Sequence, residues 1–510
     1  MKAVIIGSGV SGLTAGAYLA KLGCDVIVLE QNADIGGVTG GLKKDGFSWD
    51  LGQLILEGFG PGEQVGYILE ELGLMDAIKS ERADRTYVFP AVTIRRPDEY
   101  KGPWWRKEYL QRRFPAERAG LDAYYRMYVR FMELVTLARR AERVQGVESL
   151  LLKIRMYAKL AAFLPRIHWN ARKMIDHFFK DENLKAVFLS ILADFVVRPT
   201  QFTGLGIPAV NPEPAFDSRV PLEISKTGLQ PSYRFIDGGC RPLVDALAQL
   251  IERHGGIIHR DEEVYKIQIE QNAVKVVICQ DGNSYPADIV VASGGAQEVF
   301  FDLVGRQYLD AKFIKRIETL PLMESILMVQ LGIDFDPRPW QKDAVCYYYR
   351  THDIERGVDE ILSGRYHEGK DGFLICIPSY YTPSMAPDGC HALTVYTIAP
   401  NRLSEGTWDS RRQELADKLL ALAEEVIPGL REHSKAKIIL TPQDFKKITH
   451  LKHHAFGGCA PVMGTKGAPH RSSIPGLWFV GAQSESGAGI NNVMEGSWRT
   501  VRMIRKEYNL

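Results

Sequence analysis

Three glycines near the start of the chain have the spacing that lets a backbone turn closely around a phosphate group. They lie in Gly7-Ser8-Gly9-Val10-Ser11-Gly12, directly after a short apolar run. Gly7 permits a tight strand-to-helix turn, Gly9 lets the backbone approach a pyrophosphate, and Gly12 lets the helix pack closely on the strand. The helix that begins with Val10 and Ser11 would present unpaired N–H groups and its positive dipole end to the phosphates.

An acidic residue at the end of the next predicted strand supports this interpretation. The stretch 25–29 has the apolar character of a buried strand, and Glu30 ends it. A carboxylate in that position accepts hydrogen bonds from ribose hydroxyl groups, so the segment predicts a dinucleotide-binding βαβ unit. A second glycine pair, Gly36-Gly37, and then Gly52 would let another loop close over an extended cofactor. Pure NAD dehydrogenases lack that loop, so we expect FAD.

Segments far downstream must complete the sheet that holds this unit. Residues 263–267, 274–278 and 288–292 have strand patterns, and a last apolar strand, 476–480, runs into Gly481-Ala482. A glycine-rich stretch that includes Gly489-Ile490-Asn491 follows. We expect a helix from about Val493 to the C-terminus, with its positive dipole end directed at the residues that precede it.

Taken together, these motifs resemble the phytoene desaturase, carotenoid isomerase and retinol saturase group of FAD enzymes and, more loosely, the amine oxidases. The resemblance rests on Gly36-Gly37, Trp49-Asp50-Leu51-Gly52, Pro378-Ser379, Thr382-Pro383, Ala386-Pro387, Gly389, Thr441-Pro442-Gln443-Asp444-Phe445, Thr449, Gly457-Gly458 and the segment from Gly481 to Asn491. The chain departs from the group's pattern at Val38 and Thr39, where arginine is usual, and at Ser486 and Asn491-Asn492, where proline and glycine are common.

The resemblance implies an α/β fold with a discontinuous, Rossmann-like FAD-binding domain of the amine-oxidase (GR2) type and an inserted α+β substrate domain. The FAD-binding domain would comprise residues 1–85, 229–300 and 455–510. The substrate domain, with a basic helical insertion, would comprise residues 86–228 and 301–454. In the resembling families the Val264 position contacts the adenine through its backbone, and the last helix points at the pyrimidine edge of the flavin. The predicted FAD-binding residues are Gly7, Gly9, Val10, Ser11, Gly12, Glu30, Gly36, Gly37, Gly52, Val264, Gly481, Ala482, Gly489, Ile490 and Asn491.

The activity that the resemblance implies is an oxidoreductase reaction on carbon–carbon bonds of an apolar polyene or isoprenoid, such as a carotenoid or retinoid. Hydride would move between a substrate carbon and flavin N5, and a proton would be lost or gained beside it. Desaturation, saturation and isomerisation all occur on this scaffold. Two alternatives are an amine-oxidising flavoenzyme with a small aromatic-lined pocket, and a non-catalytic prenyl-lipid escort protein like the Rab escort family, which needs no flavin.

No acid–base pair is evident from the sequence, so no catalytic residue is predicted. His450, His453 and His454 lie before the last glycine-rich region, where histidines are more often surface or core residues than catalysts. Glu495 lies on the last predicted helix near the expected flavin, and an acid exposed on the helix surface is the simpler interpretation.

The stretch from Lys101 to Lys180 is strongly basic, with eighteen Lys and Arg against seven Asp and Glu. Trp104 and Trp105 lie in it, and residues 150–180 have a helical pattern with Leu151, Ile154, Ala158 and Ala161 on one stripe. Tryptophan and basic residues beside an apolar helical face are typical of an interfacial anchor, so we expect contact with an anionic membrane surface. A lid with a solvated basic face and an anionic substrate are the alternatives; nucleic acid is a poor fit.

Composition and cysteine usage limit the remaining possibilities. The chain has 510 residues with a net charge of +1, and its apolar fraction of 45% is typical of a globular protein. Because a predicted strand begins almost at Met1, we expect no targeting segment, and therefore a cytoplasmic, peripherally membrane-associated protein. The seven cysteines are scattered without a CxxC pair, so neither a disulfide framework nor a zinc site is predicted. The nine-residue spacing of His168 and His177 does not fit one helical face, so we expect no metal.

Overall fold

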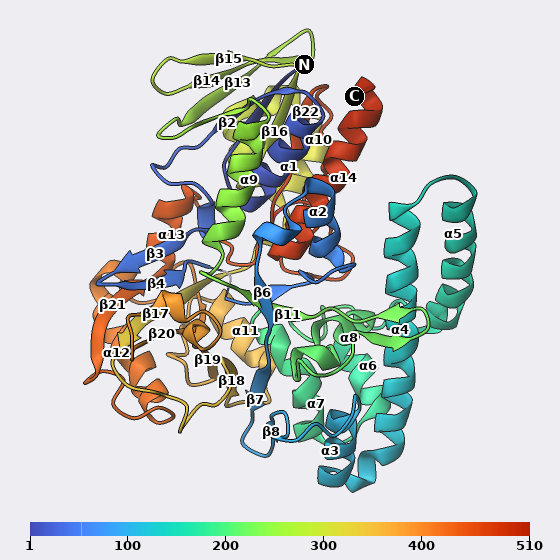
Figure 1. Ribbon diagram of the computed structural model, residues 1–510, viewed down its shortest axis with the longest axis vertical. Helices are drawn as coiled ribbons and strands as arrows, with labels where there is room; N and C mark the ends of the chain where they lie inside the picture. The colour runs from blue at the N-terminus through green and yellow to red at the C-terminus, as the bar shows by residue number, and fades with distance from the viewer. Residues whose placement is uncertain (53) are drawn as a thin grey trace.

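A parallel β-sheet at one end of the molecule joins strands from three distant stretches of the chain. The computed structural model describes residues 1–52 and 54–510. The strand order is β12-β2-β1-β16-β22, in the upper part of Figure 1. The bounds are Lys2–Ile6 for β1, Asp25–Leu29 for β2, Ile257–His259 for β12, Ile289–Ala292 for β16 and Leu477–Phe479 for β22. The expected α/β fold with a Rossmann-like parallel sheet is therefore confirmed.

Both faces of this sheet are covered, which explains why its strands are almost continuously apolar. Ala3 and Ile5 face a core that includes α1 (Val10–Lys21), α2 (Gln64–Leu72), α9 (Arg241–Arg253) and α14 (Ile490–Tyr508). Val4 and Ile6 point to the opposite face, towards β13 (Val264–Glu270), β14 (Ala273–Cys279) and β15 (Ser284–Pro286). Helix α14 begins three residues earlier than the sequence pattern predicts, directly after Gly489.

A second, seven-stranded sheet lies in the other half of the molecule. Its order is β21-β17-β20-β19-β18-β7-β8, mostly antiparallel, with β7 parallel to β18. The strands are β7 (Arg85–Val88), β8 (Thr93–Ile94), β17 (Ser325–Ile333), β18 (Val345–Tyr349), β19 (Gly372–Cys376), β20 (His391–Ala399) and β21 (Ser434–Leu440). One face packs on α12 (Trp408–Glu424), and the other faces a layer of helices from the basic insertion.

Smaller elements connect these two halves. A three-stranded sheet of β5 (Leu56–Glu57), β11 (Tyr233–Ile236) and β6 (Ser80–Arg82) lies near the centre of Figure 1. The other short strands are β3 (Gly41–Lys44), β4 (Phe47–Asp50), β9 (Glu223–Ser225) and β10 (Gly228–Leu229), and the other helices outside the insertion are α10 (Ala311–Glu318), α11 (Ile354–Leu362) and α13 (Pro442–Thr449).

The basic insertion is a set of helices dominated by one long hairpin. Its helices are α3 (Trp105–Arg113), α4 (Arg118–Arg143), α5 (Gly146–Leu160), α6 (Ala171–Phe178), α7 (Glu182–Leu189) and α8 (Ile207–Val210). The expectation of one helical stretch over 150–180 is wrong, because α5 ends at Leu160 and a 3₁₀ turn containing Pro165 separates it from α6. A proline in that position removes a helical hydrogen bond and clashes with the preceding turn.

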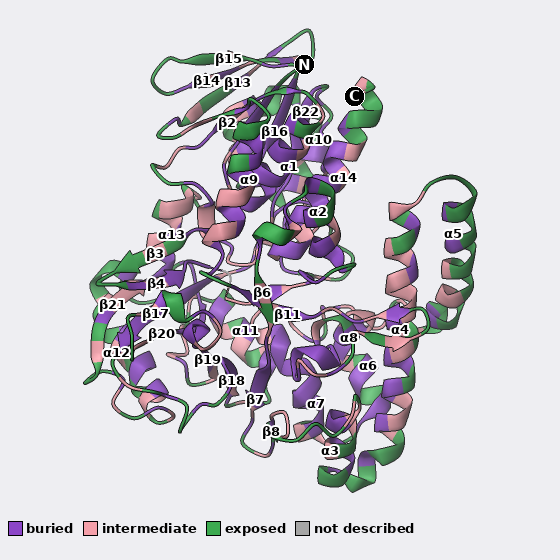
Figure 2. Cartoon of the chain, in the orientation of Figure 1, coloured by how far each residue is buried: buried purple, intermediate pink, exposed green. Residues whose placement is uncertain are grey.

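The outer helix of that hairpin, α5, packs against α4 through a small apolar contact. Leu152 packs with Leu137 and Ala141 of α4, whereas most of the remaining surface of α5 is exposed, as Figure 2 shows in green. The predicted stripe is not core: Leu151 and Ile154 are 52% and 56% exposed. Within residues 1–52 and 54–510, no helix combines the length and apolar character needed to cross a membrane.

Candidate functional site

The first glycine turn has the geometry that the sequence predicts. Gly7 has a φ of +90°, which favours glycine, and a Cβ there would lie 2.5 Å from the hydroxyl of Ser293. A Cβ on Gly12 would lie 2.1 Å from the carbonyl oxygen of Gly7, so helix α1 approaches β1 more closely than any side chain allows. A Cβ on Gly9 would meet nothing within 4 Å. The space in front of Gly9 is therefore open on the side where a phosphate would approach the backbone.

The N-termini of α1 and α14 both open at this edge of the sheet. Neither Gly9 nor Gly489, the residues that precede these helices, supplies a side-chain cap, so the first N–H groups of each helix are left for other partners. The hydroxyl of Ser497 donates to the carbonyl oxygen of Ser11 at 2.8 Å. Because Ser497 lies seven residues inside α14, the start of α14 extends about 10 Å beyond that contact at 1.5 Å per residue. Two helix ends offset in this way fit the pyrophosphate and the flavin of one extended cofactor.

The second glycine pair packs directly against the first turn. The N–H of Gly36 donates to the carbonyl oxygen of Ser8 at 3.1 Å, and Gly36 has a φ of +109°. A Cβ on Gly37 would lie 3.6 Å from the Cα of Gly9. A Cβ on Gly52 would lie 2.9 Å from the carbonyl oxygen of Val38, at the position where the resembling families place arginine. Backbone atoms occupy the space beside Val38, and the absence of side chains at the glycines lets these backbone segments pack closely.

Glu30 lies just beyond the end of β2 and is 4% exposed. One carboxylate oxygen accepts hydrogen bonds from the N–H and hydroxyl of Ser8, and the other accepts from the N–H and side-chain amide of Asn32, both at 2.9 Å. These four donors match the acceptor capacity of a carboxylate. A ribose hydroxyl would therefore replace one of the side-chain donors, from Ser8 or Asn32, when it binds Glu30.

The remaining predicted residues surround the same edge. Gly481 has a φ of +108°, and a Cβ there would lie 3.4 Å from the hydroxyl oxygen of Ser11. Ile490 and Asn491 begin α14. Val264 begins β13, two residues after Glu262, whose N–H donates to the carbonyl oxygen of Glu30 at 2.8 Å. The described residues thus bring together glycine turns, helix N-termini and an acceptor carboxylate, and this donor set fits FAD.

A buried acid beside this region has no role in the sequence-based interpretation. Asp50 is 7% exposed, and its carboxylate accepts the N–H of Cys240 at 2.7 Å. Burial raises the pKa of Asp50 to about 6, against the opposing effect of that hydrogen bond. A Cβ on Gly239 would lie 2.6 Å from this carboxylate, so only glycine allows the loop to approach it. Asp50 belongs to the Trp49-Asp50-Leu51-Gly52 motif, but nothing in that motif indicates that its carboxylate is buried.

The histidines that follow α13 have structural partners. His454 is 2% exposed, its ring stacks on Phe445 at 4.8 Å, and burial lowers its pKa to about 3. His450 contacts the side-chain oxygen of Asn32 at 3.1 Å. Neither arrangement provides an acid or base. Glu495 differs from the simple expectation of a surface acid, because its side chain is 13% exposed and pairs with Arg499 at 3.0 Å. Within the described chain, no group of three or more His, Cys, Asp or Glu is placed to hold a metal ion.

A cavity lies between the seven-stranded sheet and α11, with an empty volume of about 630 Å³ counted to its open mouth. Three tyrosines of the sheet line it: Tyr347 and Tyr349 from β18 and Tyr396 from β20. Asp194, Asp353 and Asp371 also line the cavity, and the hydroxyl of Tyr349 contacts the carboxylate of Asp194 at 3.4 Å. Burial raises the pKa of Asp194 to about 7, although the Tyr349 hydroxyl and the Arg85 cation oppose this.

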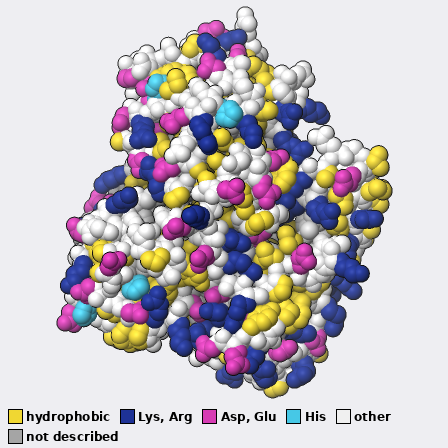
Figure 3. Space-filling model, viewed as in Figure 1, with side chains coloured by type: hydrophobic (Ala, Val, Ile, Leu, Met, Phe, Trp, Pro, Cys, Tyr) yellow, Lys and Arg dark blue, Asp and Glu magenta, His cyan; other side chains and the backbone are white. Residues whose placement is uncertain are grey.

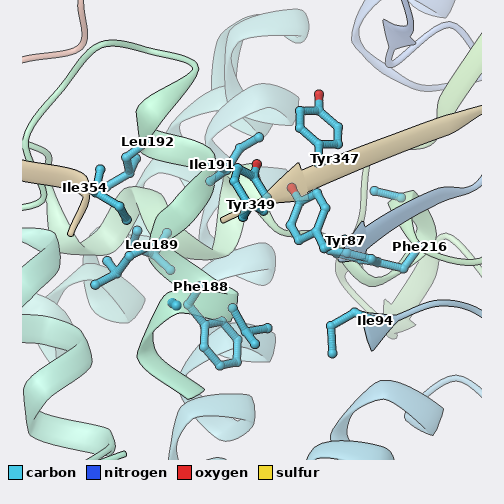
Figure 4. Packing of buried hydrophobic residues seen from close by; sticks show 14 of the residues in the cluster. Tyr87, Ile94, Phe188, Leu189, Ile191, Leu192, Phe216, Tyr347, Tyr349 and Ile354 are labelled. Carbon is cyan, nitrogen blue, oxygen red and sulfur yellow. The ribbon is translucent and has the colours of Figure 1, made fainter. Parts of the chain in front are cut away.

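Aromatic packing sets the shape of this cavity. The Tyr87 ring meets the rings of Tyr347 and Tyr349 edge-on, at 5.2 and 5.3 Å, and Figure 4 shows the three rings together, with Ile191 beside Tyr349. Tyr396 also contacts Phe456, at 5.9 Å between ring centroids.

The backbone after Phe456 links the cavity to the predicted cofactor region. A Cβ on Gly458 would lie 2.6 Å from the Cβ of Ala482, one of the predicted FAD-binding residues. Phe456 thus contacts the cavity wall, and two residues later the chain packs against Ala482. The sequence could not reveal this cavity, because its residues carry no motif and lie far apart in the chain.

Comparison with known proteins agrees with this geometry. The family model described as Flavin containing amine oxidoreductase matches residues 10–504. A rat (Rattus norvegicus) protein, pyridine nucleotide-disulfide oxidoreductase domain-containing protein 2, is 24% identical over 537 residues, covering 96% of this chain and 90% of its own length. The lycopene-forming phytoene desaturase of Pseudescherichia vulneris is 22% identical, covering 99% of each chain. The crystal structure of an oxidoreductase from Methanosarcina mazei aligns with a TM-score of 0.65 at 19% identity, covering 98% of this chain and all of its own. The resemblance to the phytoene desaturase group is confirmed.

Proposed function

The chain belongs to the flavin-containing amine oxidoreductase family and is an FAD-dependent oxidoreductase, and we propose that it acts on carbon–carbon bonds of an apolar polyene or isoprenoid. The relative that is a lycopene-forming phytoene desaturase supports this substrate class. The observation that carries the proposal is the cavity under α11. Beside its tyrosines, it is lined by aliphatic side chains: Val196, Ile354, Val358, Ile361 and Ile398. Lining of this kind suits a hydrocarbon ligand.

We propose that the discontinuous domain holds FAD through the predicted residues. In this arrangement, Gly9 and the first turn of α1 hold the pyrophosphate, Glu30 holds a ribose, and the start of α14 faces the flavin. The boundaries 1–85, 229–300 and 455–510 remain our proposal for this domain, and 86–228 with 301–454 for the substrate domain. β7 begins at Arg85 and belongs to the seven-stranded sheet, so the first boundary falls at the start of a strand.

Bound FAD would supply the acceptor or donor of a hydride. The chain would supply the proton chemistry, and Asp194 is the group that we assign to it. With a pKa of about 7, this carboxyl is partly protonated and partly ionised at neutral pH, so it can both give and take a proton. Tyr349 and Arg85 favour its ionised form, and burial opposes it. The surrounding aromatic and aliphatic side chains exclude water from the reacting carbon.

Amine oxidation is a second candidate, because the same cavity has a specific feature that favours it. Three tyrosines and the carboxyl group of Asp194, one of three in the lining, form the kind of aromatic pocket that would surround a small amine, and an ammonium group would ionise Asp194. The two candidates differ in the expected ligand: a hydrocarbon should bind independently of pH, whereas an amine should bind more weakly below pH 7.

The test of the proposal is the reduction of the bound flavin without oxygen. We expect polyenes or isoprenoids, in detergent micelles, to bleach the flavin absorbance or to re-oxidise the reduced flavin. Mono- and diamines should leave the flavin unchanged. Rapid bleaching by an amine with no response to any polyene would contradict the proposal. Extraction and mass spectrometry of lipids that copurify with the protein would identify which isoprenoid to test first.

We also propose that the helical insertion, residues 101–180, attaches the protein peripherally to an anionic membrane on the cytoplasmic side. The outer face of α5 supports this proposal: Val147, Leu150 and Tyr157 are 74%, 58% and 62% exposed. Figure 3 shows apolar and basic side chains together over α5, at the right edge of that view. Lys153 and Arg155 on the same helix are exposed, whereas Lys159 pairs with Glu133 at 2.6 Å. Of these three basic residues on α5, Lys159 is therefore less available to contact a membrane than the sequence suggests.

The double variant Leu151→Ser/Ile154→Ser tests this membrane proposal. We expect it to reduce the binding of the protein to anionic vesicles at least tenfold, because two exposed aliphatic side chains leave the interface. The matched control is Ile257→Ser/Tyr265→Ser, which changes residues of similar exposure, 52% and 56%, near the parallel sheet. Equal vesicle binding by both double variants, measured by flotation, would show that α5 does not contact the bilayer.

A further inference from the structure

A second cavity lies between the end of α4, the start of α2 and the segment 229–231, with an empty volume of about 540 Å³ counted to its mouth. Three arginines from the last turns of α4 line one wall: Arg139, Arg140 and Arg143. The opposite wall includes Glu63 and Gln64, where α2 begins. None of the residues predicted to hold FAD lines this cavity.

In the described residues, none of the three guanidinium groups has a carboxylate within ion-pair distance, although Glu57 interacts with Arg139 and Glu495 with Arg143 at longer range. In the part of the chain that the structure describes, Arg139 donates to the side-chain oxygen of Gln64 at 2.8 Å, and Arg143 donates to two backbone carbonyl oxygens at the start of α2, both at 3.3 Å. No salt bridge involves any of the three within residues 1–52 and 54–510. The nearby acids Glu142 and Glu495 pair with Arg499 instead, at 2.8 and 3.0 Å.

Glu63, the acid that lines this cavity, does not neutralise it. Its carboxylate is turned inward and accepts hydrogen bonds from the N–H of Gly60 at 2.6 Å and from the N–H and hydroxyl of Ser232 at 2.5 and 2.6 Å. Glu63 is 3% exposed, and it lies 3.8 Å from Arg234. Its charge is therefore already compensated away from the cavity.

Arginines near the end of a helix often serve only to balance the negative end of its dipole. Two observations argue for a different role here. Arg139 and Arg143 reach across to the start of α2 rather than back to the last carbonyls of α4. In addition, burial lowers the pKa of Arg143, and the neighbouring cation of Arg139 lowers it further, while Glu495 and other groups raise it. Cations held together at a cavity wall against their mutual repulsion gain free energy from an anion placed between them.

We propose that this cavity binds the phosphate group of an organic phosphate, either a lipid headgroup or a soluble phosphate ester. Guanidinium groups are planar forks that bind phosphate oxygens in pairs, and Arg139 and Arg143 lie one helical turn apart on the same face of α4. The side-chain amide of Gln64 lies on the other wall and accepts from Arg139, whereas the N–H groups of Val65 and Gly66 in the first turn of α2 already donate to the carbonyl oxygen of Gly58.

The cavity and α5 lie on different sides of α4. Arg139 and Arg143 face the start of α2, whereas Leu137 and Ala141 pack against Leu152 of α5. The phosphate could belong to a membrane lipid or to a soluble phosphate ester, since the recognising chemistry is the same.

The experiment measures the binding of inorganic pyrophosphate to the purified flavin-loaded protein by titration calorimetry. Full flavin occupancy ensures that the pyrophosphate site of FAD is filled. We expect one equivalent to bind, and Arg139→Gln/Arg143→Gln to weaken that binding at least tenfold. The matched control, Lys153→Gln/Arg155→Gln, removes the same charge from exposed positions on α5 and should bind pyrophosphate as the unmodified protein does.

A flotation assay distinguishes the two sources of phosphate. If the pocket holds a lipid headgroup, Arg139→Gln/Arg143→Gln will bind vesicles containing phosphatidic acid more weakly than the unmodified protein does. It will bind neutral phosphatidylcholine vesicles equally. If the phosphate is soluble, only pyrophosphate binding will fall. Should the double variant lose flavin or fold poorly, Arg140→Gln replaces it, because Arg140 is exposed.

The proposal is overturned if the unmodified protein binds no pyrophosphate and Arg139→Gln/Arg143→Gln binds phosphatidic acid vesicles as well as the unmodified protein does. It is also overturned if Lys153→Gln/Arg155→Gln weakens pyrophosphate binding as much as the pocket variant, because simple surface charge would then explain the effect. The readout is binding, so this result is independent of whether the enzyme turns over a polyene or an amine.

Discussion

Substitution of Gly9 by valine separates the role of a glycine in the fold from its role towards the cofactor. Gly9 has φ −57° and ψ 160°, a conformation that any residue adopts. A Cβ there meets nothing within 4 Å. The chain alone should therefore tolerate the change, with a shift in its free energy of unfolding within about 1 kcal/mol. The added side chain would instead occupy the space in front of the α1 N-terminus, where the pyrophosphate approaches.

The expected magnitude can be worked from this geometry. If free FAD is present at 100 times its Kd, its binding stabilises the folded protein by about 2.7 kcal/mol, and Gly9→Val should lose this increment. Gly12→Ala provides the contrast, because its Cβ would lie 2.1 Å from the backbone oxygen of Gly7, and we expect poor folding even without cofactor. The assay is flavin absorbance per chain, combined with thermal melting with and without added FAD. Full flavin occupancy in Gly9→Val would refute the assignment of this turn to the pyrophosphate.

Two further predictions follow from buried carboxyl groups. The pKa of Asp50 is raised from 3.8 to about 6, so its ionised form opposes folding above pH 6 by about 3 kcal/mol at 1.36 kcal/mol per pKa unit. Asp50→Asn should thus unfold at higher denaturant concentration at pH 8 but not at pH 4, and a difference that is constant from pH 4 to pH 8 would contradict this. Asp194→Asn should lower turnover by about 10²-fold or more and remove the inflection of the rate near pH 7. An unchanged pH profile would exclude Asp194 as the proton donor or acceptor.

The sequence predicts the backbone geometry of the glycine turns because that geometry depends on local requirements of each residue. Gly7 needs a positive φ, and Gly12 needs the absence of a side chain, so the residue type records the geometry directly. The strands at 288–292 and 476–480 can also be predicted from the sequence, because strands buried on both faces are almost entirely apolar. The sequence pattern predicts the start of α14 three residues too late, because the glycine that precedes the helix has no side chain to signal a helix cap.

Both cavities lie beyond what the sequence can predict, because each is made by packing between distant segments. Tyr349 and Asp194 are 155 residues apart in the chain, and Arg139 and Gln64 are 75 apart. The sequence identified the basic character of residues 101–180 but not which of its cations are paired. Lys159 forms a direct ion pair with Glu133, whereas Arg139 and Arg143 have no carboxylate within ion-pair distance in residues 1–52 and 54–510. Only the structure distinguishes the basic residues that form ion pairs from those that do not.

Arg85 explains how a carboxyl in an aromatic pocket comes to be poised near neutral pH. This arginine is 3% exposed, and its guanidinium lies over the rings of Tyr87, Phe216 and Tyr233, at 5.1, 4.8 and 4.9 Å. No carboxylate lies within ion-pair distance of it in the described chain, yet its charge acts on Asp194 and lowers the pKa of that carboxyl. Burial alone would hold Asp194 protonated at pH 7, and a direct ion pair would hold it ionised. A cation at intermediate range, stabilised by aromatic faces, leaves the carboxyl able to exchange a proton with a substrate.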